Sequence, residues 1–185
     1  MEHVHSCIII PSGRGKDIID KDLSPQEREK LLKYLAKECD NRDLSILSTA
    51  PQFSRIMTSG EYASSSLTHF DSISQQEGLG EETHFLAEFV GGCGGGRLYC
   101  GLEPNGDIIP CVFLPKVLGN IKGDDFLEVW KNSEFMEIMR DRVDYDEGCE
   151  KCEYRSICGG CRARAYAYYG NVQESDPGCI INKKK

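Results

Sequence analysis

The spacing of cysteines in the second half of the chain is the main chemical signal in this sequence. Eight of the ten cysteines follow residue 90, and four of them form a C-x2-C-x5-C-x2-C run from Cys149 to Cys161. Thiolates are soft ligands that select iron–sulfur clusters or zinc. Four thiolates complete one [4Fe–4S] cluster or one structural zinc site. The sequence therefore predicts two metal centres, whose candidate ligands are Cys93, Cys100, Cys111, Cys149, Cys152, Cys158, Cys161 and Cys179.

A disulfide framework is the main alternative for so many cysteines. Ten cysteines among 185 residues is a smaller share than such scaffolds usually carry. The first residues contain no basic segment followed by an apolar stretch, which a secretory signal would need. We therefore expect reduced thiols and a cytoplasmic location. Cys7 and Cys39 stand apart from the others and are expected to be small buried hydrophobic residues.

Charge and hydrophobicity narrow the classes of partner. The formal net charge is −8 and the pI is about 5.1. Phosphate backbones need basic surfaces, so nucleic acid is not an expected partner. No apolar stretch is long enough to span a bilayer, so no membrane partner is expected either.

The elements of residues 1–59 alternate between strand and helix. We predict a buried strand over residues 4–10, a helix opened by a capping box at residues 24–27, a strand over 44–48 and a helical turn over 52–57. This βαβ order is the unit of a parallel sheet or barrel. A (β/α)8 barrel needs about 250 residues, so residues 1–59 are expected to be the end of a larger domain. The apolar face of the helix comprises Leu31, Leu32, Leu35 and Ala36.

Polar residues at 60–87 predict a linker or lid, and residues 88–185 predict a second, cysteine-rich domain. Its glycine-rich loop at residues 91–96 would let the backbone approach a bulky cluster around Cys93. Asn105-Gly106 predicts a type I′ hairpin turn, which would bring Cys100 and Cys111 near each other. Short helices follow, one capped by Asp124 or Asp125. The fold class is therefore mixed α/β and α+β.

Two arginines follow the last cysteine of the run, Arg162 and Arg164. Their charges could neutralise an anionic cluster or substrate, and an ordinary salt-bridged pair is an equal alternative.

This combination of motifs resembles the SPASM domain, the C-terminal domain of many radical S-adenosylmethionine (SAM) enzymes that binds auxiliary [4Fe–4S] clusters. One departure is the two-residue third gap in the run, where many members have three. The motifs that carry the resemblance are Cys93, residues 100–111, Leu118-Gly119-Asn120-Ile121, Val129-Trp130, residues 149–162 and Asp176-Pro177-Gly178-Cys179.

The resemblance implies two interleaved clusters and a particular division of their ligands. Cys93, Cys100, Cys111 and Cys161 would hold the cluster nearer the substrate, and Cys149, Cys152, Cys158 and Cys179 the distal cluster. It also implies that residues 1–59 are the end of a partial TIM-like radical SAM barrel. Ser12 and Gly13 would then contact SAM at the barrel's active-site face. The resemblance is to maturases that act on haem precursors or peptides.

A C-x3-C-x2-C loop, which would hold the SAM-cleaving cluster, is absent from the sequence. We therefore interpret the chain as part of a truncated or split radical SAM protein, with SAM as a cofactor only in a complete radical SAM core. The implied partners are that N-terminal core, a peptide or tetrapyrrole-like substrate, and an electron donor such as ferredoxin or flavodoxin. A free-standing iron–sulfur electron carrier, a partner-binding module and a structural zinc protein remain as alternatives. Whether the chain is itself an enzyme stays open.

Overall fold

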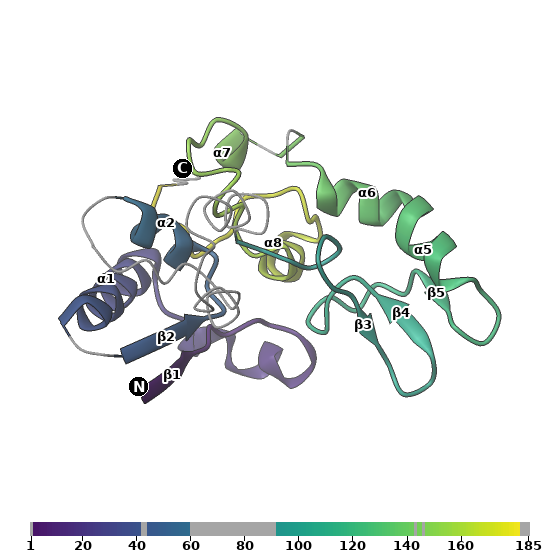
Figure 1. Cartoon of the computed structure of the whole chain (residues 1–185), viewed down its shortest axis with the longest axis horizontal. Coiled ribbons are helices and arrows are strands. Elements are labelled where there is room, and N and C mark those ends of the chain that lie inside the picture. The colour runs from purple at the N-terminus through teal and green to yellow at the C-terminus, as the bar shows by residue number, and fades with distance from the viewer. Residues whose placement is uncertain (1, 42–43, 60–91, 143, 146, 182–185) are drawn as a thin grey trace, which may run out of the picture.

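The computed structural model describes residues 2–41, 44–59, 92–142, 144–145 and 147–181. The predicted linker at 60–87 and the first residues of the predicted second domain therefore lie outside the described residues. Figure 1 shows the parallel strands β1 and β2 with helices α1 and α2 on one side, and strands β3–β5 with α5 and α6 on the other. Helix α8 lies between these two groups of elements.

The first half is the predicted βαβ unit. Strand β1 (Glu2–Ser6) pairs in parallel with β2 (Leu44–Ser48), with Val4 opposite Ile46. A 3-10 segment, η1 (Gly13–Lys21), and helix α1 (Pro25–Asn41) connect the strands, and α2 (Gln52–Thr58) follows. The prediction of a buried strand over residues 4–10 was wrong in extent, because β1 ends at Ser6 and Val4 is exposed. This βαβ order is the repeating unit of a parallel sheet or barrel. The two described strands do not by themselves form a barrel.

The capping box at the start of α1 is confirmed. The Ser24 backbone N–H donates to Glu27 Oε2 at 2.9 Å, and the Glu27 N–H donates back to Ser24 Oγ at 3.3 Å. These reciprocal bonds satisfy donors that the first helical turn leaves unpaired.

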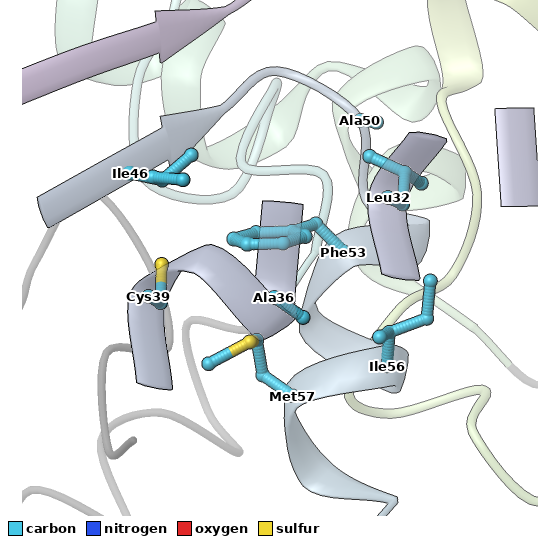
Figure 2. Close-up of a cluster of buried hydrophobic side chains, with 8 residues drawn as sticks. All are labelled: Leu32, Ala36, Cys39, Ile46, Ala50, Phe53, Ile56 and Met57. Atoms are coloured by element: carbon cyan, nitrogen blue, oxygen red, sulfur yellow. The ribbon is translucent and has the colours of Figure 1, made fainter. Parts of the chain in front are cut away.

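The first half has its own hydrophobic core, in which α1 and α2 pack against β2 (Figure 2). Figure 2 shows Phe53 of α2 between Ile46 of β2 and Ala36 of α1. Cys39 is buried in this core, as predicted, whereas Cys7 is exposed, contrary to the prediction. Leu31 was predicted to lie on the apolar face of α1, but it is 41% exposed and does not belong to this core. The core comprises Leu32, Ala36, Cys39, Ile46, Ala50, Phe53, Ile56 and Met57.

The second half contains a small antiparallel sheet with strand order β3–β4–β5. Its strands are β3 (Gly101–Leu102), β4 (Asp107–Ile109) and β5 (Gly119–Asn120). The predicted hairpin is confirmed, but its type I′ turn was wrong.

Among the described residues only glycines have positive φ, so Asn105 cannot take the left-handed conformation that a type I′ turn requires. Instead, the Gly106 N–H donates to the Glu103 carbonyl at 2.8 Å, and Gly106 has φ of 97°. This is a type I turn followed by a glycine bulge. Pro104 favours it, because proline suits the first central position of a type I turn.

The helices of the second half are short. They are α5 (Phe126–Asn132), α6 (Glu134–Arg140), α7 (Glu147–Glu150) and α8 (Arg162–Tyr169). Asp125 caps α5 by accepting the Glu128 N–H at 2.9 Å, which confirms one of the two predicted caps. A second core around Leu114 and Met139 contains Cys111 and Cys161, and Ile8 and Ile10 pack against it.

Buried ion pairs join the two halves. Arg164 of α8 bonds to Asp22 at 2.7 Å, to Asp176 at 3.2 Å and to the Ile9 carbonyl. Asp22 also pairs with Arg28 of α1 at 2.6 Å. Of the two alternatives predicted for Arg164, the structure shows the ordinary salt bridge. These bonds fix α8 against the first half.

Candidate metal centres

Four cysteines of the second half line one small cavity. They are Cys149, Cys152, Cys158 and Cys179, and no other cysteine is among the described residues that line it. These are the four residues predicted to hold the distal cluster. Residues from three short stretches of the chain thus border one cavity, and all four carry the soft thiol group that iron–sulfur clusters and zinc select.

Local backbone structure brings these four cysteines together. Cys149 lies on the short helix α7, and the Cys152 N–H donates to the Cys149 carbonyl at 3.2 Å. The Cys158 N–H donates to the Tyr154 carbonyl at 2.8 Å, which closes the next turn. Cys179 reaches the cavity from a turn in which its N–H donates to the Asp176 carbonyl at 3.0 Å.

Four cysteine side chains are suitable ligands for an iron–sulfur cluster, but the present cavity is smaller than such a cluster. The cavity encloses only about 10 Å³, so its walls would have to move outward around a four-iron cage. Burial raises the pKa of the Cys158 thiol to about 12. A metal centre here would therefore displace a proton from Cys158, and binding should depend on pH.

Three cysteines of the predicted proximal set line a second, larger cavity. Cys93, Cys111 and Cys161 reach this space of about 430 Å³, which also borders the first half at Ile10 and residues 48–51. Burial raises the pKa of both the Cys111 and Cys161 thiols, and the nearby Cys93 raises both further. A volume of this size accommodates a small-molecule ligand.

Cys100, the fourth member of the predicted proximal set, is not among the described residues that line this cavity. It precedes β3, one position beyond the Gly101–Ile109 pair, so the register sets it opposite Pro110 rather than Cys111. Cys100 is partly buried, and burial raises the pKa of its thiol. Its neighbour Tyr99 lines the cavity, with Oη 3.9 Å from Cys111 Sγ.

The glycine-rich loop holds the two groups of cysteines close together. Gly92 has φ of 75°, and a Cβ at this position would lie 1.8 Å from the Cys158 carbonyl oxygen. A Cβ at Gly95 would lie 3.2 Å from Cys111 Cβ. The positive φ and the close approach to Cys158 require glycine at position 92, whereas the approach of this loop to a cluster stays a prediction.

Asp176 organises the backbone between the two groups. Its carboxylate is buried and accepts from the Cys161 N–H at 2.9 Å, the Gly178 N–H at 2.8 Å and Arg164 Nε at 3.2 Å. Burial alone would raise the pKa of Asp176, but Arg164 and these backbone donors lower it overall. The carboxylate is therefore ionised at neutral pH.

The two residues predicted to contact SAM do not line the large cavity. Ser12 and Gly13 are not among its described lining residues, whereas Ser48, Thr49, Ala50 and Pro51 are. The Arg162 guanidinium stacks on the Tyr145 ring at 4.3 Å and donates to the carbonyls of Val172 and Glu174.

The sequence interpretation missed Arg55. This arginine of α2 lines the small cavity together with the four cysteines. It lies more than ninety residues before the cysteine run, and no local motif marks it. Only a contact between the two halves could have identified it.

No group of three or more Cys, His, Asp or Glu side chains that could hold a metal ion occurs within the described ranges. The same part of the chain has no helix that is long and apolar enough to cross a membrane.

Comparison with protein families identifies part of the second half. Residues 93–153 match the family model of SPASM, an iron–sulfur cluster-binding domain. This match covers the hairpin, helices α5 and α6, and the first two cysteines of the run.

Several curated proteins are similar to the chain. It is 32% identical to the AdoMet-dependent heme synthase of Methanosarcina barkeri, over 98% of this chain and 48% of that protein. It is 29% identical to the mycofactocin maturase MftC of Mycolicibacterium smegmatis, over 92% of this chain and 38% of the relative. The PqqA peptide cyclase of Bradyrhizobium diazoefficiens is 30% identical over 48% of this chain and 25% of its own length. The chain spans about half the length of the heme synthases it matches.

Proposed function

Because the chain carries a SPASM iron–sulfur domain and is related to radical SAM/SPASM proteins, we propose that it is the auxiliary-cluster part of such an enzyme. In this proposal, the chain holds two [4Fe–4S] clusters beside a radical SAM core. The clusters would supply electrons or an attachment point for substrate during the radical modification of a peptide or a tetrapyrrole-like molecule.

One observation carries the proposal: three cysteines of the run and the distant Cys179 line a single cavity. The pattern of these thiols supports the distal ligands Cys149, Cys152, Cys158 and Cys179. Cys93, Cys111 and Cys161 at the larger cavity support the proximal set, which Cys100 would complete from its position directly before β3.

The larger cavity suits a substrate that lies beside the proximal cluster. Apolar side chains such as Phe53, Phe113 and Met139 form much of its wall, and the polar groups include Thr49 and Tyr99. This mixture would bind an apolar body and orient it by a few hydrogen bonds. Burial, together with nearby cysteines, raises the pKa of Tyr99, so its hydroxyl would remain a hydrogen-bond donor at neutral pH.

The first half is proposed to be the end of the radical SAM barrel. We assign residues 1–59 to this part, 60–87 to a linker or lid, and 88–185 to the SPASM domain. The similarity to heme synthase extends over 98% of the chain, which supports a shared origin of both halves. Residues 48–51 lie at the C-terminal end of strand β2 and border the cavity, as active-site residues of such barrels do. They are stronger candidates for contacts near SAM than Ser12 and Gly13.

Partners follow from this proposal. The SAM-cleaving cluster would come from an N-terminal core with a C-x3-C-x2-C loop, and electrons from a donor such as ferredoxin or flavodoxin. The haem-related relative favours a tetrapyrrole substrate, and the maturase and cyclase relatives favour a peptide.

Anaerobic purification followed by iron, sulfide and zinc analysis tests the proposal. We expect about eight irons per chain, because the eight candidate thiolates would hold two clusters of four irons each. Cys7→Ala is the matched control, because Cys7 is exposed and outside both cavities, and it should keep the full iron content. Stoichiometric zinc without iron would contradict the proposal and favour a structural zinc protein.

A further inference from the structure

Arg55 is the unexpected residue at the distal cavity. It comes from α2 in the first half, yet it lines the same cavity as Cys149, Cys152, Cys158 and Cys179. Only 8% of its surface is exposed. A buried arginine is costly unless its charge and its donors are used, so its position needs an explanation.

The contacts of Arg55 leave one donor free within the described structure. Its Nη2 forms an ion pair with Glu29 of α1, and its guanidinium carbon lies 5.9 Å from the centre of the Tyr154 ring. Its Nε–H is buried and has no hydrogen-bond partner among the described atoms. Buried arginine donors normally find an acceptor, because an unsatisfied one destabilises the fold.

The positive charge of Arg55 indicates which acceptor its unpaired Nε–H would take. Burial alone would lower the pKa of Arg55, but its ion pair with the Glu29 carboxylate offsets this burial, and the pKa is raised overall. Arg55 therefore stays cationic beside two of the proposed ligands of the distal cluster. A cluster held by thiolates carries negative charge and offers sulfur atoms as acceptors.

We propose that Arg55 is a positioning residue that sets the reduction potential of the distal cluster, with Glu29 holding its guanidinium in place. This inference rests on the proposed function, because it requires a cluster at this site. Reduction adds one negative charge to the cluster, and a cationic N–H donor at its sulfur stabilises that form more than the oxidised form. Hydrogen bonds to the sulfurs and net charge are known determinants of cluster potential.

Variants of Arg55 and of Glu29 should shift the reduction potential of the distal cluster in opposite directions, which gives a test of the proposal. Arg55→Gln removes the cation and leaves the Glu29 anion near the cluster, so reduction becomes harder. Glu29→Gln removes the anion and leaves the cation uncompensated, so reduction becomes easier. A purely structural role would give no such opposition, since both variants remove the same ion pair.

The experiment is a redox titration of the anaerobically purified 185-residue chain with dithionite, followed by the EPR signal of each reduced cluster. At a fixed solution potential, we expect Arg55→Gln to lower the reduced-to-oxidised ratio of one cluster about tenfold, which is 59 mV for one electron. Glu29→Gln should raise this ratio, and the other cluster should change little. Arg14→Gln is the matched control for net charge, because Arg14 is exposed, and it should leave both potentials unchanged.

Cluster occupancy separates the possible failures. If the parent chain contains no second cluster, the proposed function fails and this inference fails with it. If both clusters are present and the two variants leave the potentials unchanged or shift them in the same direction, the inference alone is wrong. Should Arg55→Gln lose its cluster, Arg55→Lys and Glu29→Gln decide. Arg55→Lys keeps the charge but not the Nε–H, so a partial decrease of the ratio supports the proposal, and a wild-type ratio overturns it.

Discussion

Replacing Asp176 by asparagine should destabilise the second half strongly, although the two side chains have nearly the same shape. Both carboxylate oxygens are in use: Oδ2 accepts from the Cys161 N–H, and Oδ1 accepts from the Gly178 N–H and from Arg164 Nε. An asparagine must put its NH2 group where one of these oxygens was. That group would then face an N–H donor in a buried site.

The size of the effect follows from the partners that remain. Removing one member of a buried ion pair costs about 3–5 kcal/mol. Arg164 keeps its contact with Asp22 at 2.7 Å, so we expect the low end, about 3 kcal/mol. With a urea dependence of about 2 kcal/mol per molar, the unfolding midpoint should fall by about 1.5 M.

Trp130 provides the assay, because it is the single tryptophan of the chain and lies in the second half. Its fluorescence would be followed in urea for anaerobically purified wild type and Asp176→Asn at equal iron content. Asp144→Asn is the matched control, since Asp144 is an exposed carboxylate in the same half, and it should stay within about 0.5 kcal/mol of wild type.

The pH dependence checks the same reasoning. The pKa of Asp176 is lowered in the folded protein, so its stabilising effect is complete above the unfolded pKa of about 3.9. The effect is lost as the pH falls through the lower, folded pKa. The difference between wild type and Asp176→Asn should therefore be constant from about pH 5 to pH 8. An unchanged urea midpoint at pH 7 would refute the role assigned to Asp176.

Three further predictions concern the ligands, the first helix and the chemistry. Cys161→Ala should lose about half of the iron and become more sensitive to protease, because it removes one proximal ligand and metal binding contributes to folding; full iron content would contradict the ligand division. Ser24→Ala should lower the free energy of unfolding by about 1 kcal/mol, measured by urea denaturation, because it removes the capping box of α1. The chain alone should release no 5′-deoxyadenosine from SAM and reductant, measured by chromatography, because it has no C-x3-C-x2-C loop; release that depends on Cys7 or Cys39 would reveal a catalytic cluster that the cysteine spacing does not predict.

Local patterns in the sequence determined much of this protein. The capping box at Ser24 and Glu27 marked the start of α1, since both its partners lie within one turn. Strand β2 and the hairpin between Cys100 and Cys111 also followed from short runs of residues. The cysteine spacing indicated an iron–sulfur domain, because ligand identity and spacing are properties of the chain itself.

Tertiary structure decided what depends on distant contacts. Strand β1 ends at Ser6 because its partner strand β2, which comes from about forty residues further along the chain, ends opposite it at Ser48. The gathering of Cys149 and Cys179 at one cavity, the approach of Arg55 from α2 and the bonds of Asp176 join segments far apart in sequence. Their energies come from desolvation and charge pairing in the folded chain, and no local pattern of residue types encodes either.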